Sequence, residues 1–169
     1  MKIHWIKFSL PVLLFFLFSS CNAAKSLFSP QDSLERKDSS EMAFRGKIID
    51  YSKTLLGSRY RSGGKTPKGF DCSGYTGYVY KQFDIKLGAS SRNQATQGKK
   101  KSLKSLEPGD LLFFSSKGRI FHVAIFEKEE DGKFWMIHSA TSLGVVRQDI
   151  SNNNYWKKRL KFARDVISP

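Results

Sequence analysis

Cys72, His122 and His138 are the residues of this chain whose types and positions could carry out nucleophilic chemistry. Cys72 follows Asp71, a good helix N-cap residue, so it is expected in the first turn of a helix. Unpaired backbone N–H groups and the helix dipole favour an anion in that turn, which would stabilise a thiolate. His122 lies in the otherwise apolar run 120–126, where its ring needs a hydrogen-bonding partner. A thiolate on a helix packed over the sheet would be such a partner.

His138 ends the next apolar run, and neighbouring antiparallel strands can bring it beside His122, where it would fix the tautomer of that ring. The pattern therefore predicts a Cys/His/His triad. The same residues also have simpler interpretations, in which Cys72 is a small buried residue and each histidine is structural. Zinc held by one cysteine and two histidines is a further alternative, but no paired C-x-x-C or H-x-x-x-H spacing supports it. Spacing alone leaves the enzymatic and the structural interpretations open.

The first twenty residues have the layout of a secretory signal peptide, because Lys2 and Lys7 precede an apolar run and no acidic residue is present. The run is too short and too close to the terminus for a membrane-spanning helix. Two small residues precede Cys21, which resembles the lipobox of bacterial lipoproteins, where this cysteine is lipid-modified. An acylated terminus of that kind suffices for stable membrane anchoring. Ordinary signal cleavage, with Cys21 left as a spare thiol, is the alternative.

The sequence after residue 20 is expected to divide into a tether and one folded domain. Residues 21–41 are rich in Ser, Lys and Asp, which favours a lipidated N-terminus followed by a flexible tether, and residues 42–169 would form the domain. With Cys21 lipidated, two cysteines permit no disulfide within the chain, so a hydrophobic core must stabilise it.

The net charge of the chain is +14, and it falls to +12 when Lys2 and Lys7 leave with the signal peptide. For an exported protein this excess favours anionic envelope polymers or lipid head groups over nucleic acid. A merely solvated basic surface explains the charge equally well.

The secondary-structure pattern changes near Pro108. Upstream, the sequence predicts three helices, at 42–56, 72–83 and 91–97. It also predicts a loop at 62–69. Downstream it predicts β-strands at 111–115, 120–127, 134–139, 145–150 and 160–167. Asp131-Gly132 is a hairpin signal, and Asp110 is expected to be a turn residue. Helices followed by strands favour an α+β domain with an antiparallel sheet.

Four stretches resemble, in the right order, the motifs of the NlpC-type cell-wall cysteine peptidases: 57–74, 107–114, 122–126 and 137–140. The match runs from about residue 46 to the C-terminus. Residues 141–146 and 155–159 resemble, more narrowly, the short lipoprotein murein endopeptidases of that family. The resemblance implies a reduced papain-like α+β fold, with N-terminal helices packed on an antiparallel sheet of about five to six strands. It also implies hydrolysis of an amide bond in peptidoglycan stem peptides, either D-glutamyl to diamino acid or the crosslink.

By position, the resemblance assigns the roles of nucleophile, general base and orienting residue to Cys72, His122 and His138. It makes Tyr60 a donor to the oxyanion, together with the backbone N–H of Cys72, and it places Asp71 and Ser73 against the stem peptide. No metal or cofactor is implied. The implied partners are stem peptides and, through the lipid, a membrane, the outer one if the cell has two. The protein would be monomeric.

Two positions depart from the family pattern. Ala124 replaces a usual glycine, and Gly88-Ala89 stands where relatives often have Pro-Arg. Neither departure touches the triad. Two rival functions remain at this point: a non-catalytic cell-wall-binding lipoprotein, and an amidase or acyltransferase that uses the same fold.

Overall fold

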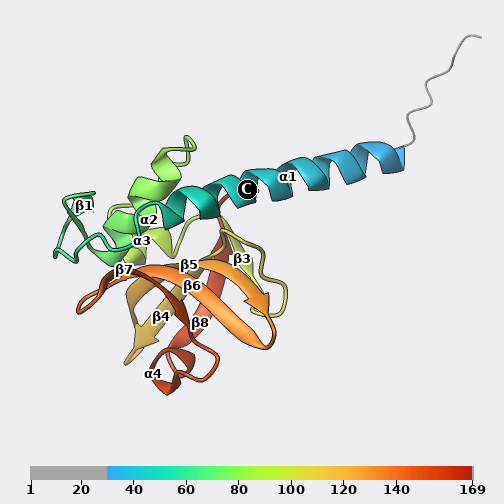
Figure 1. Cartoon of the computed structure of the whole chain (residues 1–169). Coiled ribbons are helices and arrows are strands. Elements are labelled where there is room, and N and C mark those ends of the chain that lie inside the picture. The colour runs from blue at the N-terminus through green and yellow to red at the C-terminus, as the bar shows by residue number, and fades with distance from the viewer. Residues whose placement is uncertain (1–29, 169) are drawn as a thin grey trace, which may run out of the picture.

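The computed structural model describes residues 30–168, which form a six-stranded main sheet with helices on both sides and a separate two-stranded sheet (Figure 1). The helices are α1 (Pro30–Lys53), α2 (Cys72–Lys81), α3 (Ser91–Gln94) and α4 (Asn154–Lys157). The strands are β1 (Lys65–Thr66), β2 (Gly69–Phe70), β3 (Lys99–Lys101), β4 (Leu111–Ser116), β5 (Arg119–Glu130), β6 (Lys133–Ala140), β7 (Gly144–Asp149) and β8 (Leu160–Asp165).

The main sheet has six antiparallel strands in the order β3-β8-β4-β5-β6-β7. Strands β5 and β6 meet in the predicted hairpin, where Asp131 and Gly132 both have positive φ, 53° and 69°. Two such residues give the tight turn whose twist matches that of the strands. The expected α+β class and antiparallel sheet are therefore confirmed.

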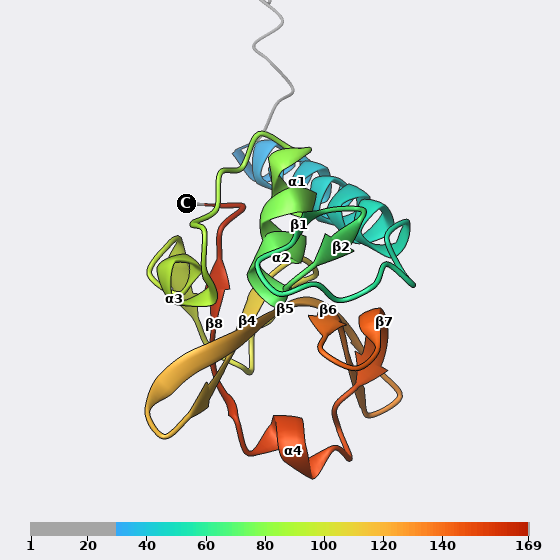
Figure 2. The ribbon, with the colours of Figure 1, turned by 90° about the vertical axis from the view of Figure 1, so that its left-hand side faces the viewer.

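Both faces of the sheet are buried, because successive apolar residues of β4 point in opposite directions. Leu111 and Phe113 join a cluster with residues of α1 and α2, while Leu112 and Phe114 join a second cluster. Trp156 of α4 packs against the second cluster. Figure 2 shows α2 and α4 on opposite sides of the sheet.

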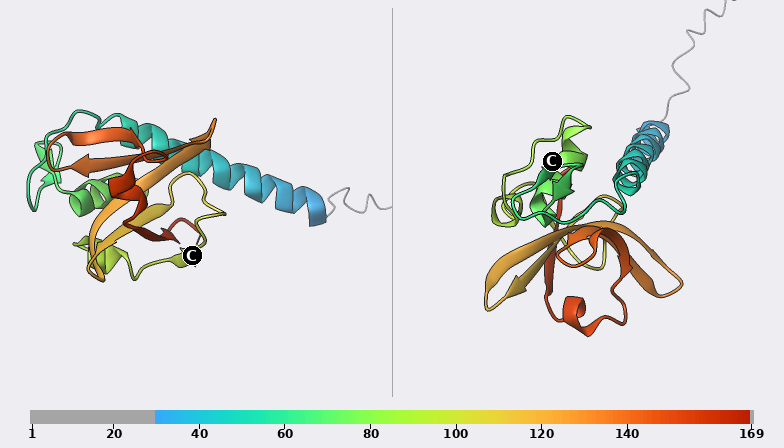
Figure 3. Two further views of the ribbon diagram at one scale, coloured as in Figure 1. Left: turned by 90° about the horizontal axis from the view of Figure 1, so that it is seen from below. Right: turned by 60° about the vertical axis from the view of Figure 1, so that its left-hand side comes forward.

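Helix α1 is longer than the sequence pattern predicted. It begins at Pro30 rather than at residue 42 and ends at Lys53 rather than at 56. Residues 30–41 of the predicted tether are therefore helical, and this end of α1 extends away from the domain (Figure 3). The polar composition misled the prediction, since Glu, Lys, Arg and Gln are good helix formers even when no apolar face is present.

The signal peptide and Cys21 lie outside the described residues, so the structure leaves those two expectations as they stand. Among residues 30–168, no helix has the length and apolar character needed to cross a membrane.

Four short elements were missed by the sequence analysis. Strands β1 and β2 pair where a loop was expected at 62–69, with β2 ending one residue beyond it, β3 pairs with β8, and α4 precedes β8. Two to four residues are too few to show a hydrophobic period, and β3 consists of three lysines. Pairing with a neighbouring strand forms the three strands, which local propensity does not reveal, and α4 is a single turn capped by Asn153.

A buried ion cluster ties α1 to the sheet. Asp110, expected as a turn residue, is fully buried, and its carboxylate faces the Arg45 guanidinium at 3.3 Å. Arg45 is also fully buried and lies 2.8 Å from the Asp165 carboxylate and 2.9 Å from that of Glu41. Burial raises the pKa of Asp110 to about 7, against the opposing effect of the nearby cations.

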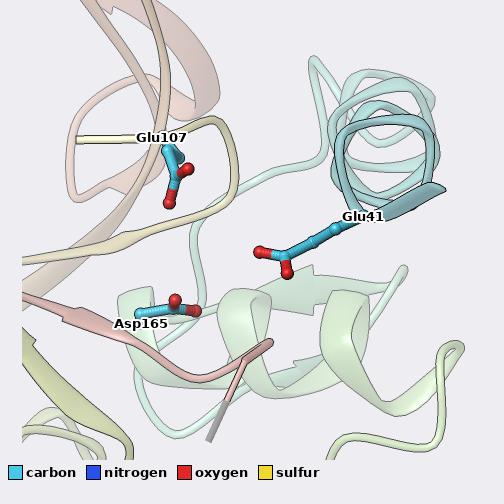
Figure 4. A group of neighbouring side chains, drawn as sticks. All are labelled: Glu41, Glu107 and Asp165. Carbon is cyan, nitrogen blue, oxygen red and sulfur yellow. The ribbon is translucent and has the colours of Figure 1, made fainter. Parts of the chain in front are cut away.

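Glu41, Glu107 and Asp165 hold three carboxylate oxygens within 4.8 Å of one another, a spacing that suits a metal ion (Figure 4). However, positively charged side chains of the protein, rather than a metal ion, balance the charge of these carboxylates. The Arg45 Nη2 atom lies within 3.5 Å of an oxygen of each carboxylate, and Lys101 also pairs with Glu107. The cluster is therefore a structural salt-bridge network.

Candidate active site

The first turn of α2 is formed as the sequence predicts. Asp71 is the N-cap, and its Oδ1 atom accepts hydrogen bonds from the Gly74 backbone N–H at 2.6 Å and from the Ser73 hydroxyl at 3.0 Å. Cys72 is the first residue of the helix. The thiol is thereby fixed at the electropositive end of α2.

The segment before α2 is held by its neighbours. The Gly64 carbonyl accepts from the Asp71 N–H at 3.0 Å, and a Cβ at Gly74 would lie 1.9 Å from that same carbonyl oxygen. The Ser139 hydroxyl of β6 donates to the Phe70 carbonyl at 2.8 Å. A glycine is thus required at 74, and the start of α2 is fastened to the strand that carries His138.

The two histidines meet on neighbouring strands. A hydrogen bond of 2.8 Å links the Nε2 atom of His122, on β5, to the Nδ1 atom of His138, on β6. His138 is fully buried, whereas 7% of His122 is exposed. His138 therefore lies behind His122, which is the position of the orienting residue in a triad.

Gln148 and Trp156 determine which ring nitrogen carries the proton. The Trp156 indole can only donate, and it lies 3.0 Å from Gln148 Oε1, so that atom is an acceptor. His138 Nε2, also 3.0 Å from Gln148 Oε1, must then donate. It follows that His138 Nδ1 accepts from His122 Nε2, which leaves Nδ1 of His122 as an unprotonated base.

Burial controls the charges of all three residues. It lowers the pKa of His122 to about 3, with a further contribution from His138, and it lowers the pKa of His138 to about 4. Burial also raises the pKa of the Cys72 thiol and outweighs the opposing N–H groups of Val123, Ser73 and Cys72 itself. Contrary to the expectation of a stabilised thiolate, the site therefore holds a thiol beside neutral imidazoles at neutral pH.

Cys72 lies between two pockets that also share Tyr60 and Phe121. One pocket, of about 300 Å³, is lined by His122 and Trp156 as well. The other, of about 400 Å³, is lined by side chains of both charge types, namely Asp71, Ser73, Arg92 and Arg119. The structure thus gathers the predicted active-site residues around Cys72, with His138 in the layer behind, whereas Cys21 lies outside the described residues.

Gln148 and Trp156 are the residues that the sequence analysis missed as parts of the site. Trp156 packs over the His122 ring, with 4.8 Å between the ring centroids, and meets His138 edge-on at 5.1 Å. Trp156 does lie in a stretch that resembles the murein endopeptidases, but no local pattern marks a lone glutamine at the end of a strand as a partner of histidine.

Replacement of Gln148 by leucine is expected to lower kcat by roughly tenfold to 100-fold with little change in KM, by analogy with the outer partners of metal-binding histidines. The variant lacks the acceptor for His138 Nε2, so the tautomers of both histidines lose their restraint. Gln148→Glu, which keeps an acceptor, should retain more activity than Gln148→Leu. Equal kcat values for wild type and Gln148→Leu, measured by steady-state kinetics, would exclude this positioning role.

The model of the NlpC/P60 family matches residues 57–165 of the chain. This range contains all three residues of the Cys/His/His arrangement as well as Tyr60.

Several known proteins are similar in sequence. Murein DD-endopeptidase MepS/Murein LD-carboxypeptidase of Escherichia coli (strain K12) is 38% identical over 125 residues, which are 73% of this chain and 64% of the relative. "Probable endopeptidase NlpC" of the same strain is 30% identical over 95% of this chain and 100% of its own length. Gamma-DL-glutamyl hydrolase of Bacillus subtilis (strain 168) is 36% identical over 72% of this chain, but only 30% of that relative is covered.

Solved structures of the same family are also similar to this chain. The NlpC/p60 domain of the peptidoglycan hydrolase SagA shares 32% identity at a TM-score of 0.60, covering 72% of this chain and 97% of that domain. An NlpC/P60 family protein from Bacillus cereus shares 31% identity at a TM-score of 0.66, covering 73% of this chain and 40% of its own. With the family motifs, the sheet and the Cys/His/His geometry all present in one domain, the chain belongs to the NlpC/P60 family.

Proposed function

We propose that this protein is a peptidoglycan hydrolase that cleaves an amide bond of murein stem peptides, with Cys72 as nucleophile, His122 as general base and His138 as orienting residue. The observation that carries the proposal is the hydrogen bond of 2.8 Å between His122 and His138, in a site where His122 and Cys72 line one pocket. The similar proteins named murein endopeptidase and peptidoglycan hydrolase support the substrate class.

The reaction follows from the tautomers of the two histidines. His122 Nδ1 takes the thiol proton as the Cys72 sulfur attacks the amide carbon, which forms a C–S bond and an oxyanion. The backbone N–H of Cys72 and the Tyr60 hydroxyl stabilise that oxyanion. When the intermediate collapses, the C–N bond breaks and His122 returns the proton to the leaving amine.

Water completes the cycle. His122 removes a proton from a water molecule, the resulting hydroxide attacks the thioester, and the C–S bond breaks as the thiol regains its proton. Every proton passes through His122, whose imidazolium is stabilised while it exists by His138 and, behind it, by Gln148.

Two bonds are compatible with this chemistry: the bond from D-glutamate to the diamino acid within one stem, and the crosslink between stems. The names of the similar proteins include both a gamma-DL-glutamyl hydrolase and a DD-endopeptidase. Product masses distinguish them, because cleavage within a stem truncates it, whereas cleavage of the crosslink converts dimers into intact monomers.

The test is digestion of purified peptidoglycan by residues 22–169, followed by mass spectrometry of the products. Cys72 is the single cysteine of that fragment, so alkylation by iodoacetamide provides an internal control. We expect new products from the free enzyme and none from the alkylated one. Binding to peptidoglycan without any product would instead identify a non-catalytic wall-binding protein, and release of an acyl group to an amine acceptor would identify an acyltransferase.

The proposal includes export and a lipid anchor on Cys21, with the domain held at a membrane of the cell envelope, the outer one where two exist. It is supported by the signal-like leader and the two small residues before Cys21. Incorporation of a labelled palmitate by the wild type and not by Cys21→Ala is the outcome expected, and equal labelling of both would refute the anchor.

A further inference from the structure

A pocket of about 410 Å³, here called the α2 pocket, lies along one side of α2. Its walls come from three parts of the chain: β1, α2 and the segment 87–89. Figure 2 shows β1 beside α2. The reaction described above uses none of this space.

The α2 pocket continues from the active site. Ser73, the residue after Cys72, lines both this pocket and the neighbouring pocket that contains Cys72. Ser73, Gly77 and Lys81 all line the α2 pocket and, at intervals of four residues, share one face of the helix. From Cys72 to Lys81 the helix rises by about 13 Å, which an extended peptide of roughly four residues can span.

Gly77 leaves space that the fold does not require. A Cβ at this position would meet Gln94 Nε2 at 3.8 Å, an ordinary contact, and the φ angle of Gly77 is not positive. Glycine is a poor helix former in a helix interior. Gly74, by contrast, is required by the close approach of Gly64. Neither backbone nor packing therefore explains Gly77, whereas a ligand in the α2 pocket does.

The charge of the α2 pocket suits an anion. Lys65 and Lys81 line it, and none of its lining residues is acidic. Neither lysine takes part in an ion pair with another residue in the described range 30–168. The ammonium group of a lysine is a compact charge on a flexible side chain, so both lysines can move to form ion pairs with a bound carboxylate.

We propose that the α2 pocket is a second subsite for the substrate, in which Lys65 and Lys81 bind a free carboxylate of the stem peptide while the scissile amide lies at Cys72. The proposal rests on the proposed function, since it takes the occupant to be a murein stem peptide. Such peptides contain acidic amino acids, which matches the charge of the pocket.

The first test compares a soluble stem peptide that has free carboxylates with the same peptide after its carboxylates are amidated. In the double variant Lys65→Gln/Lys81→Gln, KM for the free-carboxylate peptide should rise roughly fivefold at unchanged kcat, the size expected for two exposed ion pairs. KM for the amidated peptide should be the same in wild type and variant. The matched control, Lys47→Gln/Lys161→Gln, changes the net charge equally at positions outside the pocket and should behave as wild type.

The second test fills the pocket. Gly77→Met should raise KM for both peptides, and Gly77→Ala, which adds a single carbon, should raise KM less while the protein folds at least as stably. An unchanged KM in the lysine double variant and in Gly77→Met would overturn the subsite. Isothermal titration of the same substitutions in a Cys72→Ala background gives Kd without turnover. If the protein cleaves no stem peptide but these substitutions weaken its binding of the peptide, the proposed function is refuted and the subsite is supported.

Discussion

Substitution of Cys72 by alanine is expected to lower kcat/KM for peptidoglycan fragments by more than about 10⁴-fold, to the background rate. Alanine cannot form the thioester, and no other cysteine lies in residues 22–169. His122→Ala should cost nearly as much, because the thiol pKa is raised by burial and the sulfur needs a base to lose its proton. The rates are measured by chromatography of released muropeptides.

The double variant Cys72→Ala/His122→Ala tests whether the two residues act as one unit. Its activity should equal that of Cys72→Ala, because a general base has no effect once its nucleophile is gone. Ser142→Ala, at a residue that lines the same pocket but takes no part in the chemistry, is the matched control and should keep its activity. Persistent product formation by folded Cys72→Ala would show that the chemistry lies elsewhere.

Substitution of Arg45 by methionine is expected to reduce the free energy of unfolding by about 3–5 kcal/mol, the cost of removing one partner from a buried ion pair. Methionine retains much of the side-chain length but leaves Asp110 and Asp165 without the guanidinium they face at 3.3 Å and 2.8 Å. Urea denaturation monitored by circular dichroism measures the change. Lys47→Met, an exposed position on the same helix, is the control and should lie within about 0.5 kcal/mol of wild type.

The loss should also depend on pH. The pKa of Asp110 is already about 7 in the native protein, and without Arg45 it rises further above the ordinary value of 3.8. The native state then binds more protons than the unfolded state above pH 4, so this carboxyl destabilises the variant increasingly as the pH rises. The free energy of unfolding of Arg45→Met should therefore fall further below that of the wild type at pH 8 than at pH 5. Arg45→Met/Asp110→Asn should recover part of the loss, and an equal stability of Arg45→Met and Lys47→Met would refute the role of the cluster.

The predicted chemistry depended on few residues, and most of it could be read locally. Asp71 followed by Cys72 specifies a capped helix start, and His122 and His138 stand in consecutive apolar runs that a tight Asp-Gly turn must fold side by side. A cap is a contact within one turn and a hairpin is a contact between adjacent segments, so the sequence contains both partners of each interaction.

Other contacts could not be read in this way. Gln148 lies on the strand next to that of His138, but its residue type does not mark it as a partner of histidine, and its acceptor atom is identified by Trp156 from a third element. Asp110 closes the turn that begins at Glu107, as the sequence predicts, but only the fold shows that its carboxyl is buried against Arg45, which is far away in the chain. The helix propensity of residues 30–41 was hidden by their polar composition.

The sequence by itself determined the class of the fold and the family motifs, and it predicted the three residues of the proposed triad, because each depends on residue types and on contacts between neighbouring segments. Only the tertiary structure decided their protonation, since burial keeps the Cys72 thiol and both imidazoles neutral and a chain of hydrogen bonds assigns each proton. Only the tertiary structure, too, joined β1, α2 and the segment 87–89 into the α2 pocket. Burial and pocket shape are properties of surfaces that meet on folding, and no stretch of sequence contains both sides of such a contact.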